Sequence, residues 1–178
     1  MRLFVALDLP PALRDRLSSL TSYAIPGARW VPEENYHLTL RFIGETPGWQ
    51  AEEIDHALAA LRAPAFTLTL AGLGTFGKSA RGLMLWAGVE RTPALDHLRA
   101  KIETALQRIG LEPERRRFAP HVSLAKLDNP PEAKLAAYLQ ANSLFRAPPV
   151  PVRHFTLFSS LLCKDHAVYT AEAEYELS

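Results

Sequence analysis

The sequence predicts an α+β protein with two mainly antiparallel sheets flanked by helices, built as a pseudo-symmetric duplication. Strands and helices interleave irregularly with short connections, which argues against a repeated parallel crossover. The tetrad His37-Leu38-Thr39-Leu40 recurs as His121-Val122-Ser123-Leu124, at a separation close to half the length of the chain. Each half shows a helix, a histidine strand, a helix and two strands, an order that indicates duplication. Because no low-complexity linker separates the halves, we expect one bilobed domain over residues 1–178.

Composition and charge narrow the class of protein. The 178 residues are 48% hydrophobic, enough to bury a sizeable core. No apolar run approaches the roughly 20 residues that span a bilayer, and the first residues do not read as a signal peptide, so we expect a cytoplasmic protein without membrane contact. The single cysteine, Cys163, excludes an internal disulfide framework. The net charge is only +1, although Arg115 to Arg117 gather just before the second tetrad.

Hydrophobic spacing and proline or glycine boundaries predict the elements of both halves. In the first half we expect a strand over 2–9, a helix over 10–20, a strand over 36–43, a helix over 49–61, and strands over 66–70 and 82–89 joined as a hairpin by a glycine-containing connection. In the second half we expect a helix over 93–110, a strand over 118–126, a helix over 131–139, and strands over 150–159 and 167–177.

The tetrads carry the chemistry that the sequence predicts. Because successive side chains of a strand point to opposite faces, each tetrad can present an imidazole and a hydroxyl to a cleft while its apolar residues enter the core. The first tetrad would present His37 and Thr39, and the second His121 and Ser123. Arg41 shares the parity of His37, so alternation makes it a candidate phosphate clamp.

A third match to the same pattern, His154-Phe155-Thr156-Leu157, means that the pattern alone cannot select the functional histidines. Context favours His37 and His121, because each of their strands is followed by a proline-marked turn and a helical pattern, whereas His154 is followed by another strand. His56 and His97 lie in predicted helices, and we expect them on solvated faces. No third ligand stands at a recognisable spacing from the two histidines, which argues against zinc.

Longer segments around the tetrads resemble a known family. The segments 31–45 and 118–126 resemble the two signatures of the two-histidine (2H) phosphoesterase superfamily, and most closely the RNA 2′,3′-cyclic phosphodiesterases, also called 2′-5′ RNA ligases. The opening segment 4–10 and the closing segment 155–160 fit the same branch. The resemblance implies two similar lobes around a central cleft, with one tetrad from each lobe and with no metal or other cofactor.

The resemblance also implies roles for the tetrad residues. His121 would act as the general base that takes a proton from water, and His37 as the general acid that protonates the departing 3′ oxygen. Thr39 and Ser123 would donate hydrogen bonds to the non-bridging phosphate oxygens. The reaction would open an RNA 2′,3′-cyclic phosphate to a 2′-phosphate.

Further contacts with phosphate and bases are expected around the tetrads. Arg117 and Lys126 join Arg41 as phosphate-binding candidates, although Lys126 stands where the family usually has arginine, and simple alternation places it opposite His121 unless a bulge intervenes. Phe42 shares the parity of Leu38 and Leu40, so we expect it in the core. Tyr36 and Trp30 are candidate platforms for base stacking, with ordinary packing as the alternative.

The expected partner is RNA with a 2′,3′-cyclic phosphate end, with tRNA halves as one source, bound by a monomer. The same site could run weakly in reverse and join 2′-5′ linkages. Two other functions remain open from the sequence. One is a phosphodiesterase for 2′,5′-oligonucleotides or a small cyclic nucleotide, and the other is a non-catalytic module that binds RNA ends.

Overall fold

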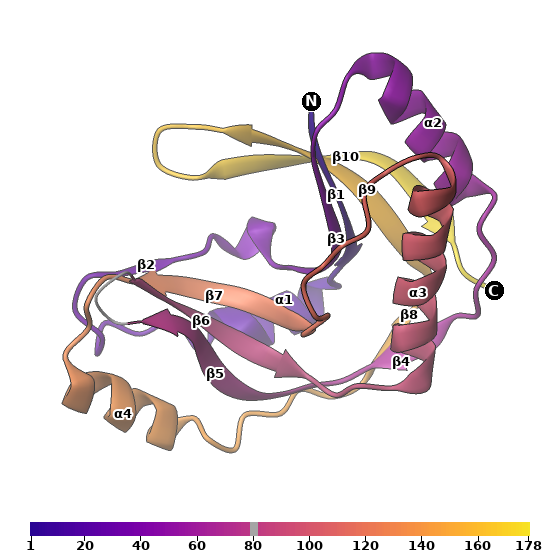
Figure 1. Cartoon of the computed structure of the whole chain (residues 1–178). Helices are drawn as coiled ribbons and strands as arrows, with labels where there is room; N and C mark the ends of the chain where they lie inside the picture. The colour runs from indigo at the N-terminus through magenta and orange to yellow at the C-terminus, as the bar shows by residue number, and fades with distance from the viewer. Residues whose placement is uncertain (79–81) are drawn as a thin grey trace.

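The computed structural model describes residues 1–78 and 82–178 (Figure 1). In chain order its elements are β1 (Arg2–Asp8), α1 (Pro11–Ser18), β2 (Ala28–Trp30), the 3-10 helix η1 (Glu33–Asn35), β3 (His37–Glu45), α2 (Gly48–Ala59), β4 (Phe66–Leu68), β5 (Leu70–Lys78), β6 (Gly82–Val89), α3 (Pro93–Arg108), β7 (His121–Leu127), α4 (Glu132–Ala141), β8 (Val150–Val152), β9 (His154–Leu162) and β10 (Ala167–Glu176). None of the helices in these residues is both long and apolar enough to cross a bilayer.

Antiparallel pairing joins the strands into two sheets, which confirms the predicted α+β class. The larger sheet has the order β10-β9-β1-β3-β7-β6-β5, with β2 also paired to β7, and the smaller sheet consists of β4 and β8. β3 and β7, the two tetrad strands, lie side by side in the middle of the larger sheet. They meet through one registered pair, Leu38 with Val122. This narrow junction divides the sheet into two lobes.

Each lobe combines strands from both halves of the chain. The β9–β10 hairpin of the second half extends the β1–β3 lobe, whereas the β5–β6 hairpin of the first half extends the lobe that contains β7 (Figure 1). Helices α2 and α3 pack against each other beside the first lobe, and α3 also contacts β3. Strand β7 therefore pairs directly with a hairpin from the other half of the sequence, whereas β1 lies between β3 and the β9–β10 hairpin.

The interval between the two tetrads along the chain recurs between other pairs of helices and strands, which supports the predicted duplication. Helices α2 and α4 begin at Gly48 and Glu132, which are separated along the chain by the same interval as His37 and His121. Strands β5 and β9 begin at the same interval from each other. So do β4 and β8, which in addition pair with each other. The two halves are thus equivalent in order, in spacing and in part of their pairing.

Helix α3 illustrates how the sequence forms the predicted elements. Thr92 caps it by accepting a hydrogen bond from the backbone N–H of Leu95, and Pro93 occupies its first turn, where no backbone donor is needed. Its apolar stripe is fully buried, as the spacing predicts, and consists of Leu95, Leu98, Ile102 and Leu106. The helix is therefore anchored along its whole length.

Strand β5 departs from the sequence-based prediction, in which its glycines indicate a connection. It pairs with β6 along its length, whereas β4, the segment expected to form that hairpin, pairs with β8. A side chain at Gly74 would collide with the ring of Trp86, since a Cβ there would lie 2.3 Å from the ring. Glycine is thus needed here for close packing rather than for a turn. The predicted strand over 150–159 also divides into β8 and β9, and β2 was not anticipated.

A β-bulge lies at the same place in both tetrad strands. In β3 the register against β1 skips Leu40, and in β7 the register against β6 skips Leu124, the equivalent residue of the second tetrad. A bulge adds one residue to one strand and reverses the alternation beyond it. The residues that follow each tetrad therefore face the opposite way from a regular strand.

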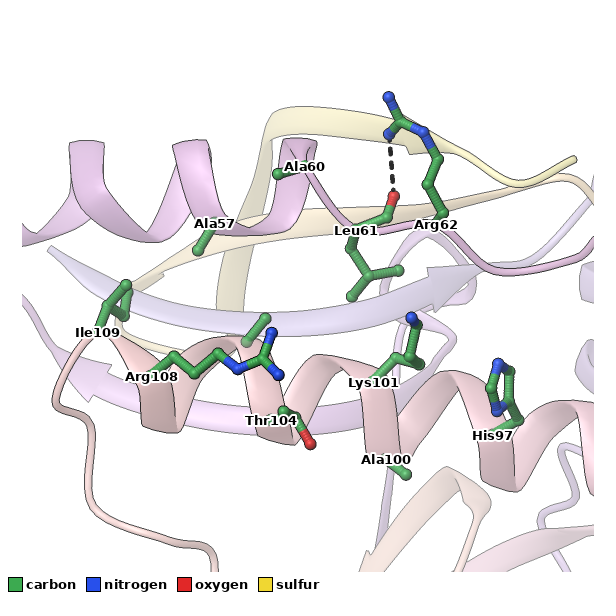
Figure 2. A pocket seen from close by; sticks show the side chains of 11 residues that line it. Ala57, Ala60, Leu61, Arg62, His97, Ala100, Lys101, Thr104, Arg108 and Ile109 are labelled. Carbon is green, nitrogen blue, oxygen red and sulfur yellow. Dashed lines mark hydrogen bonds between the residues drawn. The ribbon is translucent and has the colours of Figure 1, made fainter.

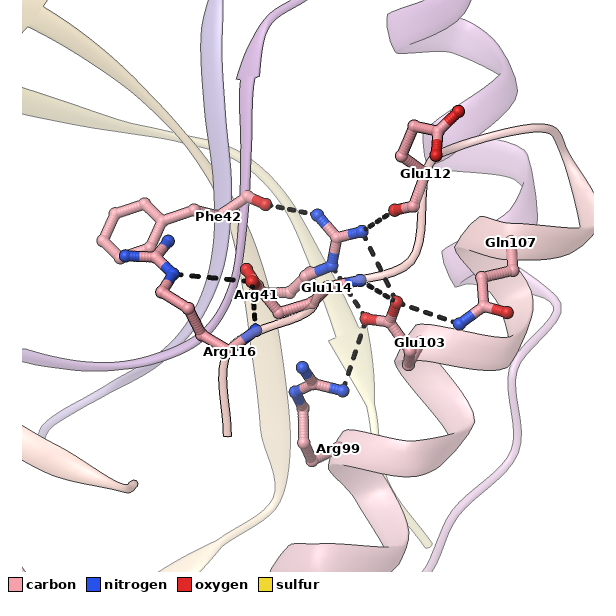
Figure 3. Close-up of polar contacts among 8 residues, drawn as sticks. All are labelled: Arg41, Phe42, Arg99, Glu103, Gln107, Glu112, Glu114 and Arg116. Atoms are coloured by element: carbon pink, nitrogen blue, oxygen red, sulfur yellow. Dashed lines mark hydrogen bonds and ion pairs between the residues drawn. The ribbon is translucent and has the colours of Figure 1, made fainter. Parts of the chain in front are cut away.

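The bulge at Leu40 contradicts the parity argument for Arg41 and for Phe42. Arg41 is buried on the face opposite His37, and its Nε lies 2.7 Å from Oε2 of Glu103, with side-chain exposures of 7% and 12%. The guanidinium also donates to the backbone carbonyls of Phe42 and Glu112 (Figure 3). Phe42, expected in the core, is instead 53% exposed. Arg41 ties β3 to α3 and to the segment that leads to the second tetrad.

Glu103 completes this buried cluster. Its Oε1 accepts from the backbone N–H of Glu114 at 2.9 Å and from the side chain of Gln107 at 3.0 Å (Figure 3). Burial by itself would raise the pKa of Glu103, but the hydrogen bonds from Arg41, Glu114 and Gln107 outweigh it and lower the pKa to about 2. The carboxylate is therefore charged over the whole physiological range.

Replacing Glu103 should destabilise the fold in a pH-dependent way. Glu103→Gln leaves Arg41 buried without a counter-ion, so we expect the free energy of unfolding at pH 7 to fall by about 3 kcal/mol. Because the folded-state pKa lies below the ordinary 4.5, the carboxylate stabilises the fold fully above pH 4.5 and loses this effect as the pH falls toward 2. Urea unfolding of both proteins at several pH values should show the difference shrinking accordingly. The exposed control Glu52→Gln should change little, and an equal loss at pH 3 and pH 7 would contradict this role.

Candidate active site

The two tetrads meet across the junction of the lobes. Leu38 pairs with Val122, and extending this antiparallel register by one residue in each direction places His37 across from Ser123 and Thr39 across from His121. Leu38 and Val122 are fully buried and point into the core. The imidazoles and hydroxyls, on the other face of the sheet, thus form a four-residue cluster with approximate twofold symmetry.

These four side chains line one cleft with a volume of about 610 Å³. Arg2 and Arg116 bring positive charge to its wall. Phe4, Phe42 and Tyr169, all from the lobe that contains β3, add aromatic surface to the lining. The cleft can therefore hold an anion beside two proton carriers, with flat apolar surfaces next to it.

Backbone carbonyls orient both imidazoles in the same way. Nδ1 of His37 lies 2.8 Å from the carbonyl oxygen of Asn35, and Nδ1 of His121 lies 2.7 Å from that of Ala119. A carbonyl can only accept, so each Nδ1 carries a hydrogen, which leaves Nε2 free for proton transfer. Nε2 of His37 lies 2.9 Å from the hydroxyl of Thr39, from which it accepts when the ring is neutral. Each carbonyl stands two residues before its histidine, another mark of the duplication.

The surroundings of His37 are the more enclosed. Its ring lies 5.0 Å from the ring of Phe4 and 5.1 Å, edge to face, from that of Tyr169, measured between centroids. Burial among these groups lowers the pKa of His37 below its usual 6.5, despite the hydrogen bond to Asn35, and the positive charge of Arg14 acts in the same direction. His121 has an aromatic neighbour of its own, Phe76, whose centroid lies 4.9 Å away. In the free protein the neutral form of His37 is therefore favoured.

The basic residues that the sequence predicts as phosphate contacts lie in different places relative to the cleft. Arg41 is held by Glu103 and by backbone carbonyls, as described above. Lys126 pairs with Met84, a residue of the cleft, so the bulge at Leu124 places it on the face of His121. Arg117 lines a smaller hollow beside the cleft, and its neighbour Arg116 lines both.

Several cleft residues were not selected from the sequence. Arg2 and Tyr169 come from strands at opposite ends of the chain, and only the β1–β9–β10 pairing brings them to the cleft. Phe4 belongs to an apolar run in which no alternation marks a cleft face. The one available signal was the cluster of three arginines before the second tetrad, which contains Arg116.

Other residues considered from the sequence lie elsewhere. His154 begins β9 and lies 4.0 Å from Glu174, beside a different hollow. Tyr36 is buried in the core, and Trp30 packs edge to face on Tyr138, so neither lines the cleft. His56 and His97 are exposed on α2 and α3, as predicted.

A second hollow, of about 520 Å³, lies between α2 and α3, away from the tetrads (Figure 2). The polar and charged side chains that line it include His97, Lys101 and Arg108 from α3 and Arg62 from the segment after α2. Among the residues that the structure describes, its lining contains no pair of histidines like that of the cleft. The cleft between the lobes is therefore the better candidate for chemistry.

Comparison with known proteins agrees with this geometry. Residues 9–161 match the family described as the 2′-5′ RNA ligase superfamily. A Thermotoga maritima protein named RNA 2′,3′-cyclic phosphodiesterase is 30% identical over 99% of this chain and 96% of its own length. One of the same name from Geobacillus stearothermophilus is 37% identical over 69% of this chain, a match that spans only 41% of that protein.

Solved structures show the same fold. The apo form of E. coli LigT superimposes with a TM-score of 0.80 and 28% identity, covering 99% of this chain and 97% of that one. The Thermus thermophilus protein TT0787 gives a TM-score of 0.78 and 26% identity, with the same coverage. Together with the paired tetrads in one cleft, these matches show that the chain belongs to the 2′-5′ RNA ligase superfamily, the two-histidine phosphoesterases.

Proposed function

We propose that this protein hydrolyses the 2′,3′-cyclic phosphate at an RNA end to a 2′-phosphate, without a metal. The observation that carries the proposal is a pair of imidazoles on the wall of one cleft, in which a carbonyl fixes each Nδ1 and a hydroxyl residue lies beside each ring, so that each Nε2 is the nitrogen left for proton transfer. Two such groups can supply both proton transfers that phosphodiester hydrolysis needs. The names of the relatives point to the same reaction.

The proposed reaction is one displacement at phosphorus. Nε2 of His121 removes a proton from water while the water oxygen forms a bond to phosphorus. The bond between phosphorus and the 3′ oxygen breaks, and Nε2 of His37 delivers its proton to that oxygen. The hydroxyls of Thr39 and Ser123 donate to the non-bridging oxygens, where negative charge increases in the transition state. Afterwards each histidine exchanges a proton with solvent and returns to its starting state.

The cations of the cleft would position the substrate rather than transfer protons. Arg2 and Arg116 lie in the cleft with the histidines, and Lys126 lies farther along the face of His121. Arg117 lies beside them in the smaller hollow. A phosphate bound among these groups would also favour the protonated form of His37, which the reaction requires.

We also propose a weak ligation activity and a monomeric protein. If the 5′-hydroxyl of another RNA end takes the place of water, its oxygen forms the bond to phosphorus, His121 takes its proton, and the 3′ oxygen leaves with a proton from His37, so a weak 2′-5′ ligation of RNA ends, such as tRNA halves, would use the same residues. Both tetrads come from one chain, which supports a complete site in a monomer. The strand exchange between the halves supports one bilobed domain over 1–178. We place the protein in the cytoplasm, with its RNA substrate.

Alanine at either histidine should reduce turnover by orders of magnitude while leaving substrate binding. For His37→Ala and His121→Ala we expect losses of roughly 10²–10⁴ in kcat on RNA with a cyclic phosphate end, because each removes one proton-transfer group. The assay should contain excess chelator, in which the wild type is expected to stay active. His97→Ala, on the exposed face of α3, serves as the matched control. Retained activity in either cleft variant would contradict the proposal, as would faster turnover of 2′,5′-linked oligomers or a small cyclic nucleotide. Binding without any turnover would indicate an RNA-end binding module.

The lowered pKa of His37 predicts where activity is lost. In the free protein His37 gains its proton only as the pH falls below 6.5, so the alkaline limb of kcat/KM should lie below 6.5. The limb of kcat should lie at higher pH, because bound phosphate stabilises the imidazolium. An NMR titration of His37 measures the group directly, and Tyr169→Ala should move its pKa back toward 6.5 by admitting water. A pKa at or above 6.5 in the free protein would contradict this account.

A substrate whose leaving group departs without a proton can show which histidine is the general acid and which is the general base. In a 3′-deoxynucleoside 2′-(4-nitrophenyl phosphate), which has no 3′-hydroxyl to attack the phosphorus, nitrophenolate departs without protonation, so His37→Ala should recover most of its lost activity relative to the wild type. His121→Ala should remain inactive, since the attacking water still needs a base. Release of nitrophenolate is measured by its absorbance. Recovery in His121→Ala instead would reverse the two roles.

A further inference from the structure

A smaller hollow, which we call the side pocket, opens beside the cleft. It has a volume of about 350 Å³. The side pocket and the cleft share four lining residues, which are Thr39, Phe42, Arg116 and His121. The two spaces are therefore contiguous at the histidine proposed to activate water. A ligand with one phosphate between the imidazoles could continue directly into the side pocket.

The side pocket is positively charged. Arg41, Arg99, Arg116 and Arg117 line it, with Glu114 as the one carboxylate among the lining residues that the structure describes. Arg41 is neutralised by Glu103, which lies behind the wall. Even with Glu103 included, arginines outnumber carboxylates by four to two. This excess favours an anionic ligand.

Arg99 is the best placed of these cations to bind one. Its side chain is only 13% exposed, and its Nη1 lies 3.3 Å from Oε2 of Glu103, the same oxygen that Arg41 approaches at 2.7 Å. One carboxylate thus serves two guanidinium groups. The Nε of Arg99 is buried and has no hydrogen-bond partner among residues 1–78 and 82–178. A buried donor without a partner is costly and leaves Arg99 short of hydrogen-bond acceptors. An anion bound to the exposed part of its guanidinium, in the side pocket that Arg99 lines, would supply further acceptors.

Aromatic side chains hold Arg99 and provide a surface for the rest of a nucleotide. The guanidinium carbon of Arg99 lies 5.5 Å from the ring centroid of Phe118, a cation–π contact that limits its movement. Phe42 and Phe76 are both exposed, and both line the side pocket. An anionic group flanked by planar apolar surface matches the combination of phosphate, ribose and base in a polynucleotide.

We propose that the side pocket binds the phosphodiester that joins the terminal nucleotide to its 5′ neighbour, with Arg99 as its principal contact. This inference rests on the proposed function and deepens it. The enzyme would distinguish the end of an RNA chain from a free nucleoside 2′,3′-cyclic phosphate, which lacks that phosphodiester. Arg99 would be a specificity residue that takes no part in the proton transfers.

The test compares a dinucleotide ending in a 2′,3′-cyclic phosphate with adenosine 2′,3′-cyclic phosphate. We expect the wild-type kcat/KM to favour the dinucleotide by about tenfold or more, as for a charge-assisted contact. Arg99→Met should remove most of this preference and leave kcat/KM for adenosine 2′,3′-cyclic phosphate within about twofold of the wild type, which also shows that the variant is folded. Arg99→Lys should retain part of the preference. Arg108→Met, on the same helix but at the hollow between α2 and α3, should retain all of it.

A substrate whose internal linkage carries no charge provides a second, independent test. A dinucleotide with methylphosphonate in place of the internal phosphodiester should lose the preference with the wild-type enzyme and show no further loss with Arg99→Met, since the two changes remove the same contact. Equal wild-type rates on the phosphodiester and the methylphosphonate would overturn the side-pocket inference alone. Absence of hydrolysis of every cyclic phosphate would instead overturn the proposed function.

Discussion

The antiparallel pairing of Leu38 with Val122 is the constraint on which the rest of the site depends. The pair lies at the junction of the lobes, where β3 and β7 meet through this one registered contact. Its burial fixes which face of each strand enters the core, and a shift of register by one residue would turn the imidazoles inward. The same pair places each histidine opposite the hydroxyl residue of the other tetrad. Packing in the core and chemistry in the cleft are thus two results of one register.

The bulge at the end of each tetrad changes which residues of the strand face the cleft and which face the core. Before the bulge, alternation presents a histidine and a hydroxyl to the cleft. Beyond it, Arg41 turns to the far face and binds Glu103, while Phe42 and Lys126 occupy equivalent positions on the cleft face of the two lobes. The lobes differ at this position, with an aromatic ring in one and an ammonium in the other. An approximately symmetric scaffold therefore supports an asymmetric cleft, in which the burial of His37 is a second difference.

Features that depend on the spacing of residues along the chain could be predicted from the sequence alone. The repeat of His37-x-Thr39 and His121-x-Ser123, the helices with regular apolar stripes and the α+β class all follow from spacing along the chain. Arg41 and Phe42 were misplaced because a bulge is a property of the pairing between strands. β5 was missed because Gly74 makes room for Trp86, a residue that reaches it only across the sheet. The positions of Arg2, Tyr169 and Arg99 likewise depend on pairings between distant segments.

The central claim is that two imidazoles from the two halves of the chain act on one phosphate. A crystal structure of the protein with a nucleoside 2′-phosphate, the proposed kind of product, tests it most directly. We expect Nε2 of His37 and Nε2 of His121 to lie within hydrogen-bond distance of oxygens of the same phosphate group, with the hydroxyls of Thr39 and Ser123 on its other oxygens. A phosphate that contacts only one histidine, or that binds outside the cleft, would contradict the account.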